Sequence, residues 1–151
     1  VIDVAARKVL TTIKVGKRPR GIGFTPDGKR AYVACELANQ VFVIDVSSHK
    51  VIAVIPAGVR SNGITVHPKG NMVFVSNGAD GTVGVIDTAS NKITKTIKVG
   101  DRPWNMAVSA DGKKLYVPNG RSNTVSVIDI DKLEKISDIK VGDQPWGVFI
   151  P

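Results

Sequence analysis

The sequence of 151 residues predicts an all-β protein, a β-propeller of four-stranded antiparallel blades. It repeats itself every 42 residues without insertions or deletions, so that the tripeptide Val-Ile-Asp ends at Asp3, Asp45, Asp87 and Asp129. Each unit contains four short stretches with strand-like alternation, separated by turn sequences. No stretch keeps a period of 3.6 residues, which excludes helical repeats. A unit of four strands is too long for one coil of a β-helix, so the propeller remains.

The first strand of each unit is expected at residues 21–25, 63–67, 105–109 and 147–151. Its apolar side chains alternate, as in Ile22 and Phe24. The opposite face carries small residues in three of the four copies, for example Gly23. Small residues fit an innermost strand that is crowded around a central channel.

The other three strands follow in a fixed order. A turn with glycine at 28, 70 or 112 leads to a second strand that contains Tyr32-Val33 in the first complete unit. A polar loop then leads to the Val-x-Val-Ile-Asp strand, whose terminal aspartate is expected to bond to amides of the next turn. The last strand, for example 93–99, alternates apolar residues with Thr and Lys, as expected of an outer edge strand.

The repeat divides residues 1–151 into one propeller segment. Complete blades are expected at about 17–58, 59–100 and 101–142, between a partial blade at 1–16 and another at 143–151. Because propellers have about four to eight blades, we expect a piece of a larger propeller with about seven blades. The alternative is assembly from several chains, in which another copy or a partner supplies a missing strand.

Composition excludes several classes of function. The net charge is +8, but the lysines are scattered over turns and solvent-facing positions, so nucleic-acid binding is not expected. No apolar run approaches the roughly 18 residues of a membrane span. The single cysteine, Cys35, excludes an internal disulfide and a cysteine-based zinc site, and a buried, inert thiol is expected there.

The loops that join one blade to the next carry the candidate binding residues. One repeat position holds Arg18, Arg60, Arg102 and Gln144, and two positions further on stand Arg20, Asn62, Trp104 and Trp146. The loops after the second strands, expected on the same face, add Glu36 and Arg121, which do not repeat. Guanidinium groups beside indoles could bind a carboxylate or phosphate. Alternatively, each arginine bonds to neighbouring loop carbonyls and holds adjacent blades in register.

No catalytic residue, metal site or cofactor is predicted from these patterns. His49 and His67 occupy turns on the opposite face, and neither has two further ligands near it in the alignment. No arrangement of serine, histidine and aspartate, and no glycine-rich dinucleotide motif, is evident.

The repeat resembles the YVTN-type β-propeller repeat over the whole chain. The resemblance rests on the order Val-Gly-x-x-Pro, Pro-Asp-Gly-Lys, Tyr-Val-x-Asn and Val-x-Val-Ile-Asp, and is strongest at 99–103 and 111–119. Departures include Phe74 in place of Tyr and Cys35 in place of Asn. The family is functionally diverse and mostly exported, so the resemblance implies a scaffold in a periplasmic or extracellular location.

The leading hypothesis is a non-catalytic scaffold that binds a protein, the remaining blades of its parent propeller or a small anionic partner on the loop face. The resemblance also implies two alternatives. An exported redox protein, similar to haem d1 or quinone-dehydrogenase-associated propellers, would need a haem-ligating histidine at the channel mouth, where this sequence places none. A lactonase-like hydrolase would need acidic and amide metal ligands, for which Glu36 and Asp80 are the candidates.

Overall fold

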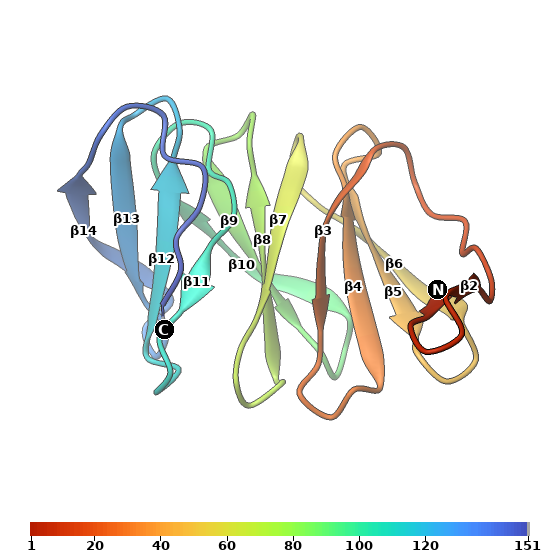
Figure 1. The fold of residues 1–151 in the computed structure, drawn as a ribbon. Helices are drawn as coiled ribbons and strands as arrows, with labels where there is room; N and C mark the ends of the chain where they lie inside the picture. The colour runs from red at the N-terminus through yellow and green to blue at the C-terminus, as the bar shows by residue number, and fades with distance from the viewer. Residues whose placement is uncertain (151) are drawn as a thin grey trace.

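A computed structural model describes residues 1–150, which form fourteen strands and no helix (Figure 1). A hairpin comes first: β1 (Ile2–Asp3) and β2 (Lys8–Val9). The first blade has β3 (Pro19–Phe24), β4 (Arg30–Cys35), β5 (Gln40–Asp45) and β6 (Lys50–Pro56). The second has β7 (Ser61–Val66), β8 (Met72–Asn77), β9 (Thr82–Asp87) and β10 (Lys92–Lys98), and the third β11 (Ala107–Val108), β12 (Lys114–Asn119), β13 (Thr124–Asp129) and β14 (Glu134–Lys140).

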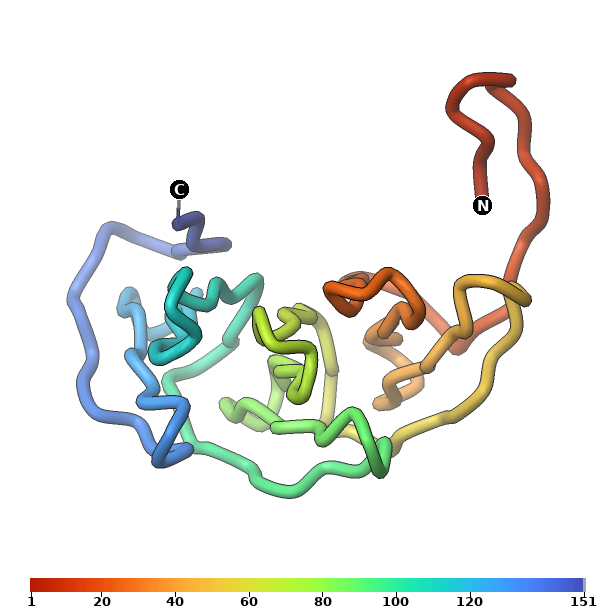
Figure 2. The backbone as a smooth tube through the Cα atoms, turned by 90° about the horizontal axis from the view of Figure 1, so that it is seen from below, coloured from red at the N-terminus to blue at the C-terminus, as the bar shows by residue number. Residues whose placement is uncertain are grey.

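The three blades stand side by side along an arc, with β3, β7 and β11 innermost and β6, β10 and β14 outermost (Figure 2). Every pairing between named strands is antiparallel and joins neighbours along the chain. The predicted all-β fold of four-stranded antiparallel blades is therefore confirmed. The described residues include no helix able to span a membrane.

Two of the expected first strands differ in the structure: one is shorter, and the other is not formed among the described residues. Instead of spanning 105–109, β11 is confined to Ala107–Val108, with an isolated bridge from Pro103 to Asn119. Residues 147–150 form no named strand and touch the third blade through a parallel bridge between Asn105 and Gly147. Pro151, the last residue of that expected strand, lies outside the described residues.

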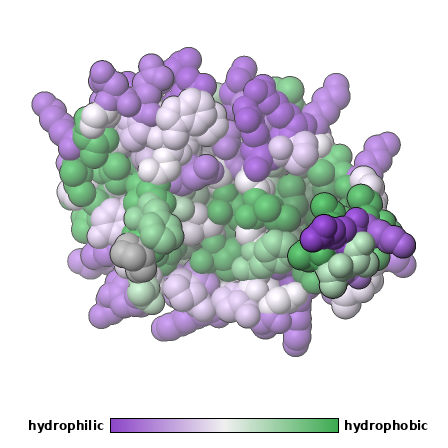
Figure 3. Space-filling view, in the orientation of Figure 1, coloured by the Kyte–Doolittle hydropathy of each residue, from purple (hydrophilic) through white to green (hydrophobic). Residues whose placement is uncertain are grey.

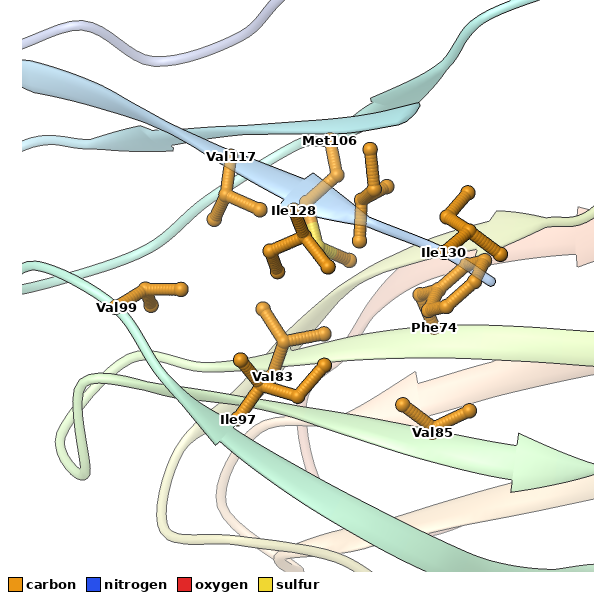
Figure 4. Packing of buried hydrophobic residues seen from close by; sticks show 10 residues of the cluster. Phe74, Val83, Val85, Ile97, Val99, Met106, Val117, Ile128 and Ile130 are labelled. Atoms are coloured by element: carbon orange, nitrogen blue, oxygen red, sulfur yellow. The ribbon is translucent and has the colours of Figure 1, made fainter. Parts of the chain in front are cut away.

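The core consists of apolar layers between neighbouring blades. Phe74, Val83 and Ile97 of the second blade pack against residues of the third, including Met106 and Ile128 (Figure 4). The layer between the first and second blades repeats this arrangement with Tyr32, which is fully buried like Phe74. Burying a side chain of this size stabilises the fold by about 1.5–3 kcal/mol. The side chains of these layers fill the space between blades and so set their spacing.

The turns repeat as closely as the strands do. The aspartate that ends each third strand accepts a hydrogen bond from the main-chain N–H three residues later, which confirms its predicted role. Asp45 also accepts hydrogen bonds from the hydroxyls of Ser47 and Ser48. These bonds to the ionised form lower its pKa from 3.8 to about 2.

A histidine links two neighbouring blades at the face opposite the arginine-rich loops. Nδ1 of His67 accepts a hydrogen bond from the N–H of Lys69 within its own turn, so Nε2 carries the proton and donates to the carbonyl of Gly112 at 3.0 Å. Gly112 adopts a φ of 74°, and a Cβ there would lie 2.6 Å from Nε2. The sequence indicated a turn residue at His67 but not this contact between blades.

We expect Gly112→Ala to destabilise the protein more than Gly28→Ala. Both glycines have positive φ, which costs an alanine about 1–2 kcal/mol, but a Cβ at Gly28 would meet nothing within 4 Å. Gly112→Ala should lose about 1–3 kcal/mol more, because it disturbs the His67 bond. Urea denaturation measures both free energies of unfolding, and equal losses would contradict the proposed linking role of His67.

We expect the Asp45→Asn variant to lose less folding stability in acid than the unaltered chain does. The pKa of Asp45 is lowered in the folded state, so its contribution to stability is present above pH 3.8 and is lost as pH falls through about 2. The urea midpoint should therefore drop less between pH 5 and pH 2 in the variant than in the unaltered chain. Asp131→Asn is the control, because among residues 1–150 its carboxylate makes no side-chain hydrogen bond; a similar change there would refute the assignment.

Candidate functional site

The loops between blades and the loops after the second strands meet at one end of the molecule, the upper end in Figure 1. Between them lies a cavity of about 280 Å³. Its lining has one carboxylate, that of Glu36, and five guanidinium groups, those of Arg18, Arg20, Arg60, Arg102 and Arg121. The lining therefore carries four more positive than negative charges. The structure brings together seven of the eight predicted binding residues, with Trp104 as the seventh.

Glu36 stands at the centre of three of these arginines. Its side chain is only 5% exposed, and Oε2 lies 2.7 Å from Nε of Arg20 and 3.1 Å from Nε of Arg18. Oε1 lies 3.3 Å from Nη1 of Arg60, which comes from the next loop. One buried carboxylate therefore ties together two neighbouring loops.

The environment keeps Glu36 ionised. Burial alone would raise the pKa of its carboxyl, but the hydrogen bond from Arg20 and the charges of Arg20, Arg18 and Arg60 outweigh burial and hold the pKa below its usual value. A carboxylate with a lowered pKa and three cationic partners is a weak base. Its role in this geometry is to position guanidinium groups.

Trp104 lines the cavity, and its ring lies against that of Trp146 outside the cavity. The two rings stack with centroids 4.5 Å apart and an interplanar angle of 27°. Trp104 is 7% exposed, whereas Trp146 is 58% exposed and does not line the cavity. The guanidinium of Arg102 lies 5.0 Å from the ring centroid of Trp104 and 6.0 Å from that of Trp146, a cation–π arrangement.

Arg102 and Arg121 differ from the other three arginines of the cavity. Within residues 1–150, neither is within salt-bridge distance of a carboxylate. A guanidinium that faces a cavity without a counterion can bind a carboxylate or phosphate oxygen from solution.

The repeated arginine position makes its structural contact through the main chain. Arg18, Arg60 and Arg102 all have a φ of 58°, and Gln144 at the same position has a φ of 52°. The carbonyls of these three arginines accept hydrogen bonds from the main-chain N–H groups of Glu36, Gly78 and Gly120. Because the main chain holds the loops, the side chains are free for other contacts. In place of the expected bonds to loop carbonyls, the side chains of Arg18 and Arg60 form ion pairs with Glu36, and that of Arg102 lies over the Trp104 ring.

The sequence also carries a signal for the cavity at the repeat position of Glu36. The repeat position of Glu36 is occupied by Gly78 in the second blade and Gly120 in the third. Gly78 lines the cavity, and the Trp104 ring nitrogen lies 3.0 Å from a Cβ built at Gly120. Glycine therefore leaves room at two copies of the position, while the third copy supplies the carboxylate.

Other candidates lie away from the cavity. Cys35 is fully buried and burial raises the pKa of its thiol, as expected for an inert cysteine. His67 lies at the opposite face, and His49 lines a different, apolar groove. Among residues 1–150, no group of three histidine, cysteine, aspartate or glutamate side chains is placed to hold a metal ion.

The fold is shared with solved structures of other proteins. Kuenenia stuttgartiensis Hydrazine Synthase is similar with a TM-score of 0.83 and 30% sequence identity, over 85% of this chain and 38% of that chain. A functionally unknown protein from Desulfotomaculum acetoxidans DSM 771 has a TM-score of 0.76 and 19% identity, over 88% and 45%. The second likeness shows the fold alone. The chain thus spans less than half the length of either protein, and no curated protein matches it.

A protein-family model described as Lactonase, 7-bladed beta-propeller matches residues 4–146. A seven-bladed family agrees with the expectation that these blades form part of a larger propeller. The resemblance to YVTN-type repeats stays a prediction, because the match is to this other description. Since the match covers nearly the whole sequence, the chain belongs to the Lactonase, 7-bladed beta-propeller family.

Proposed function

We propose that the arginine cavity binds a small anion, a carboxylate or a phosphate, without catalysing a reaction. The observation that carries this proposal is the charge balance: five arginines line the cavity with one carboxylate, and Arg102 and Arg121 have no carboxylate partner among residues 1–150. An anion held by these two groups would form charge-assisted hydrogen bonds in a partly enclosed site.

The size of the cavity supports a small ligand. Its volume of about 280 Å³ is near the lower end of ligand sites, which usually measure about 300–1,000 Å³. The face of Trp104 and the exposed Trp146 lie beside Arg102, so an anion bound there would change the surroundings of the only two tryptophans in the chain.

The family description favours a second candidate function, hydrolysis of a lactone. Arginines around a cavity could stabilise the negative charge that develops on a lactone oxygen. Hydrolysis also needs a group that activates water, and Glu36, the one carboxylate in the lining, is engaged by three arginines. Binding therefore remains the leading proposal, and release of acid from a panel of simple lactones would show that the second is right.

Anion binding should weaken by about tenfold or more in Arg121→Ala and in Arg102→Ala, because each loses one charge-assisted hydrogen bond. Quenching of tryptophan fluorescence during titration with inorganic phosphate, and separately with acetate, measures the affinity. The effect should diminish as NaCl is raised.

Arg7→Ala is the matched control for Arg102→Ala, because Arg7 also has a positive φ, 52° against 58°, and lies outside the cavity. It should leave the affinity unchanged. Equal weakening in all three variants would indicate a general effect of net charge and would refute a local site.

Glu36→Gln should separate the binding role of the arginines from their structural role. We expect the free energy of unfolding to fall by about 1–2 kcal/mol at pH 7, a modest loss because the arginines are partly exposed. The affinity for phosphate should rise about tenfold, because the carboxylate of Glu36 no longer competes with the anion for the positive charge of the arginines. Because the pKa of Glu36 is lowered in the folded state, its stabilisation is present above pH 4.5 and is lost on further acidification. The stability difference between variant and parent should therefore shrink below pH 4.5. Weaker phosphate binding by the variant would contradict the competition between Glu36 and the ligand.

A further inference from the structure

The loops around the arginine cavity also carry exposed aliphatic side chains. Leu37 is 53% exposed and Val59 is 47% exposed. Each is a direct neighbour in the chain of a residue that lines the cavity, since Leu37 follows Glu36 and Val59 precedes Arg60. In Figure 3 this upper end of the molecule is mostly hydrophilic, and most of the hydrophobic surface lies below it. The two aliphatic side chains therefore differ from the surface around them.

The main chain holds these residues at equivalent positions in the three blades. In each blade, one hydrogen bond joins the loop after the second strand to the loop before the first strand. The three bonds run from the N–H of Leu37 to the carbonyl of Lys17, from that of Ala79 to that of Val59, and from that of Arg121 to that of Asp101. Because the repeated bond uses main-chain groups, the fold does not dictate which side chains stand at these positions.

The side chains at these positions place aliphatic surface next to unpaired positive charge. Leu37, Val59 and Ala79 belong to the first two blades, and Ala79 itself lines the cavity. Arg121 of the third blade lines the same cavity together with Arg102, and within residues 1–150 neither lies within salt-bridge distance of a carboxylate. A free acetate or phosphate ion would use only the guanidinium groups. A ligand that uses both parts of this surface carries a negative group and an aliphatic group.

An extended peptide can present both groups at once. The cavity, with a volume of about 280 Å³, is small, so it suits one acidic side chain whose main chain stays outside on the loops. In an extended peptide, side chains two residues apart point to the same side and stand roughly 6.5–7 Å apart. When an acidic side chain enters the cavity, the side chains two residues before and after it therefore face the same loops, where Leu37 and Val59 are exposed.

We propose that this surface is a docking site for an extended acidic segment of a protein partner. Arg102 and Arg121 hold a carboxylate side chain of the segment, and aliphatic side chains two residues away from it pack on Leu37 and Val59. The proposal rests on the anion binding proposed above and names the molecule that carries the anion. The charge of the cavity selects an acidic segment. The aliphatic contact adds affinity that an exposed ion pair alone does not supply.

Two capped peptides and acetate test the proposal on the unaltered chain. The leucine peptide is acetyl-Leu-Ser-Glu-Ser-Leu-amide and the serine peptide is acetyl-Ser-Ser-Glu-Ser-Ser-amide, so each carries one negative charge, as acetate does. In tryptophan fluorescence titrations, the leucine peptide should bind about tenfold more tightly than the serine peptide, because only it offers aliphatic side chains. Equal affinities of the two peptides, with acetate still bound, would overturn the docking surface and leave the proposed function intact. If acetate and phosphate also fail to bind, both proposals fall.

Variants of the chain locate the site. Leu37→Ser and Val59→Thr keep the main-chain bonds of the loops, and each should weaken binding of the leucine peptide about threefold or more while leaving acetate binding unchanged. Arg121→Ala should weaken binding of both peptides and of acetate. Ile52→Thr is the matched control, because Ile52 of the outermost strand β6 is 50% exposed and does not line the cavity. Weaker binding of the leucine peptide by Ile52→Thr, or unchanged binding by Arg121→Ala, would refute the docking surface.

Discussion

The packing of each blade against the next is the constraint on which the rest of the structure depends. Tyr32 and Phe74 occupy the same place in successive layers, and both are fully buried. Because protein interiors are close-packed, the packing of these two rings fixes the distance and rotation between neighbouring sheets. Loops that lie 42 residues apart in the sequence therefore come together at one end of the molecule, where Arg18 and Arg60 reach the same carboxylate.

The candidate site arises where the repeats differ. At one repeat position the three blades carry Glu36, Gly78 and Gly120. The carboxylate of Glu36 gathers guanidinium groups from two loops, and the missing side chain of Gly78 leaves the cavity open. The main chain meanwhile makes the repeated contacts, for example from the carbonyl of Arg60 to the N–H of Gly78. Because the main chain makes the repeated contacts, the side chains at this position can differ between blades, and the charge distribution differs with them.

Much of the fold, and less of the site, could be predicted from local sequence. Alternation and turn residues indicated four strands in each unit, and the aspartates that end the third strands bond to turn amides as expected. Local patterns could not show that β11 is reduced to two residues, because its apolar alternation resembles that of β7. They also could not show the bond from His67 to Gly112, which joins residues of different blades.

The sequence by itself determined the repeat, the strand order and the face on which the arginines lie, because these follow from short-range periodicity and from an exact spacing of 42 residues. Only the tertiary structure decided which arginines are paired. Glu36 neutralises part of the charge of Arg18, Arg20 and Arg60, whereas Arg102 stacks on Trp104. Electrostatic pairing depends on distances of a few ångströms between side chains from different loops, and those distances are set by how the blades pack.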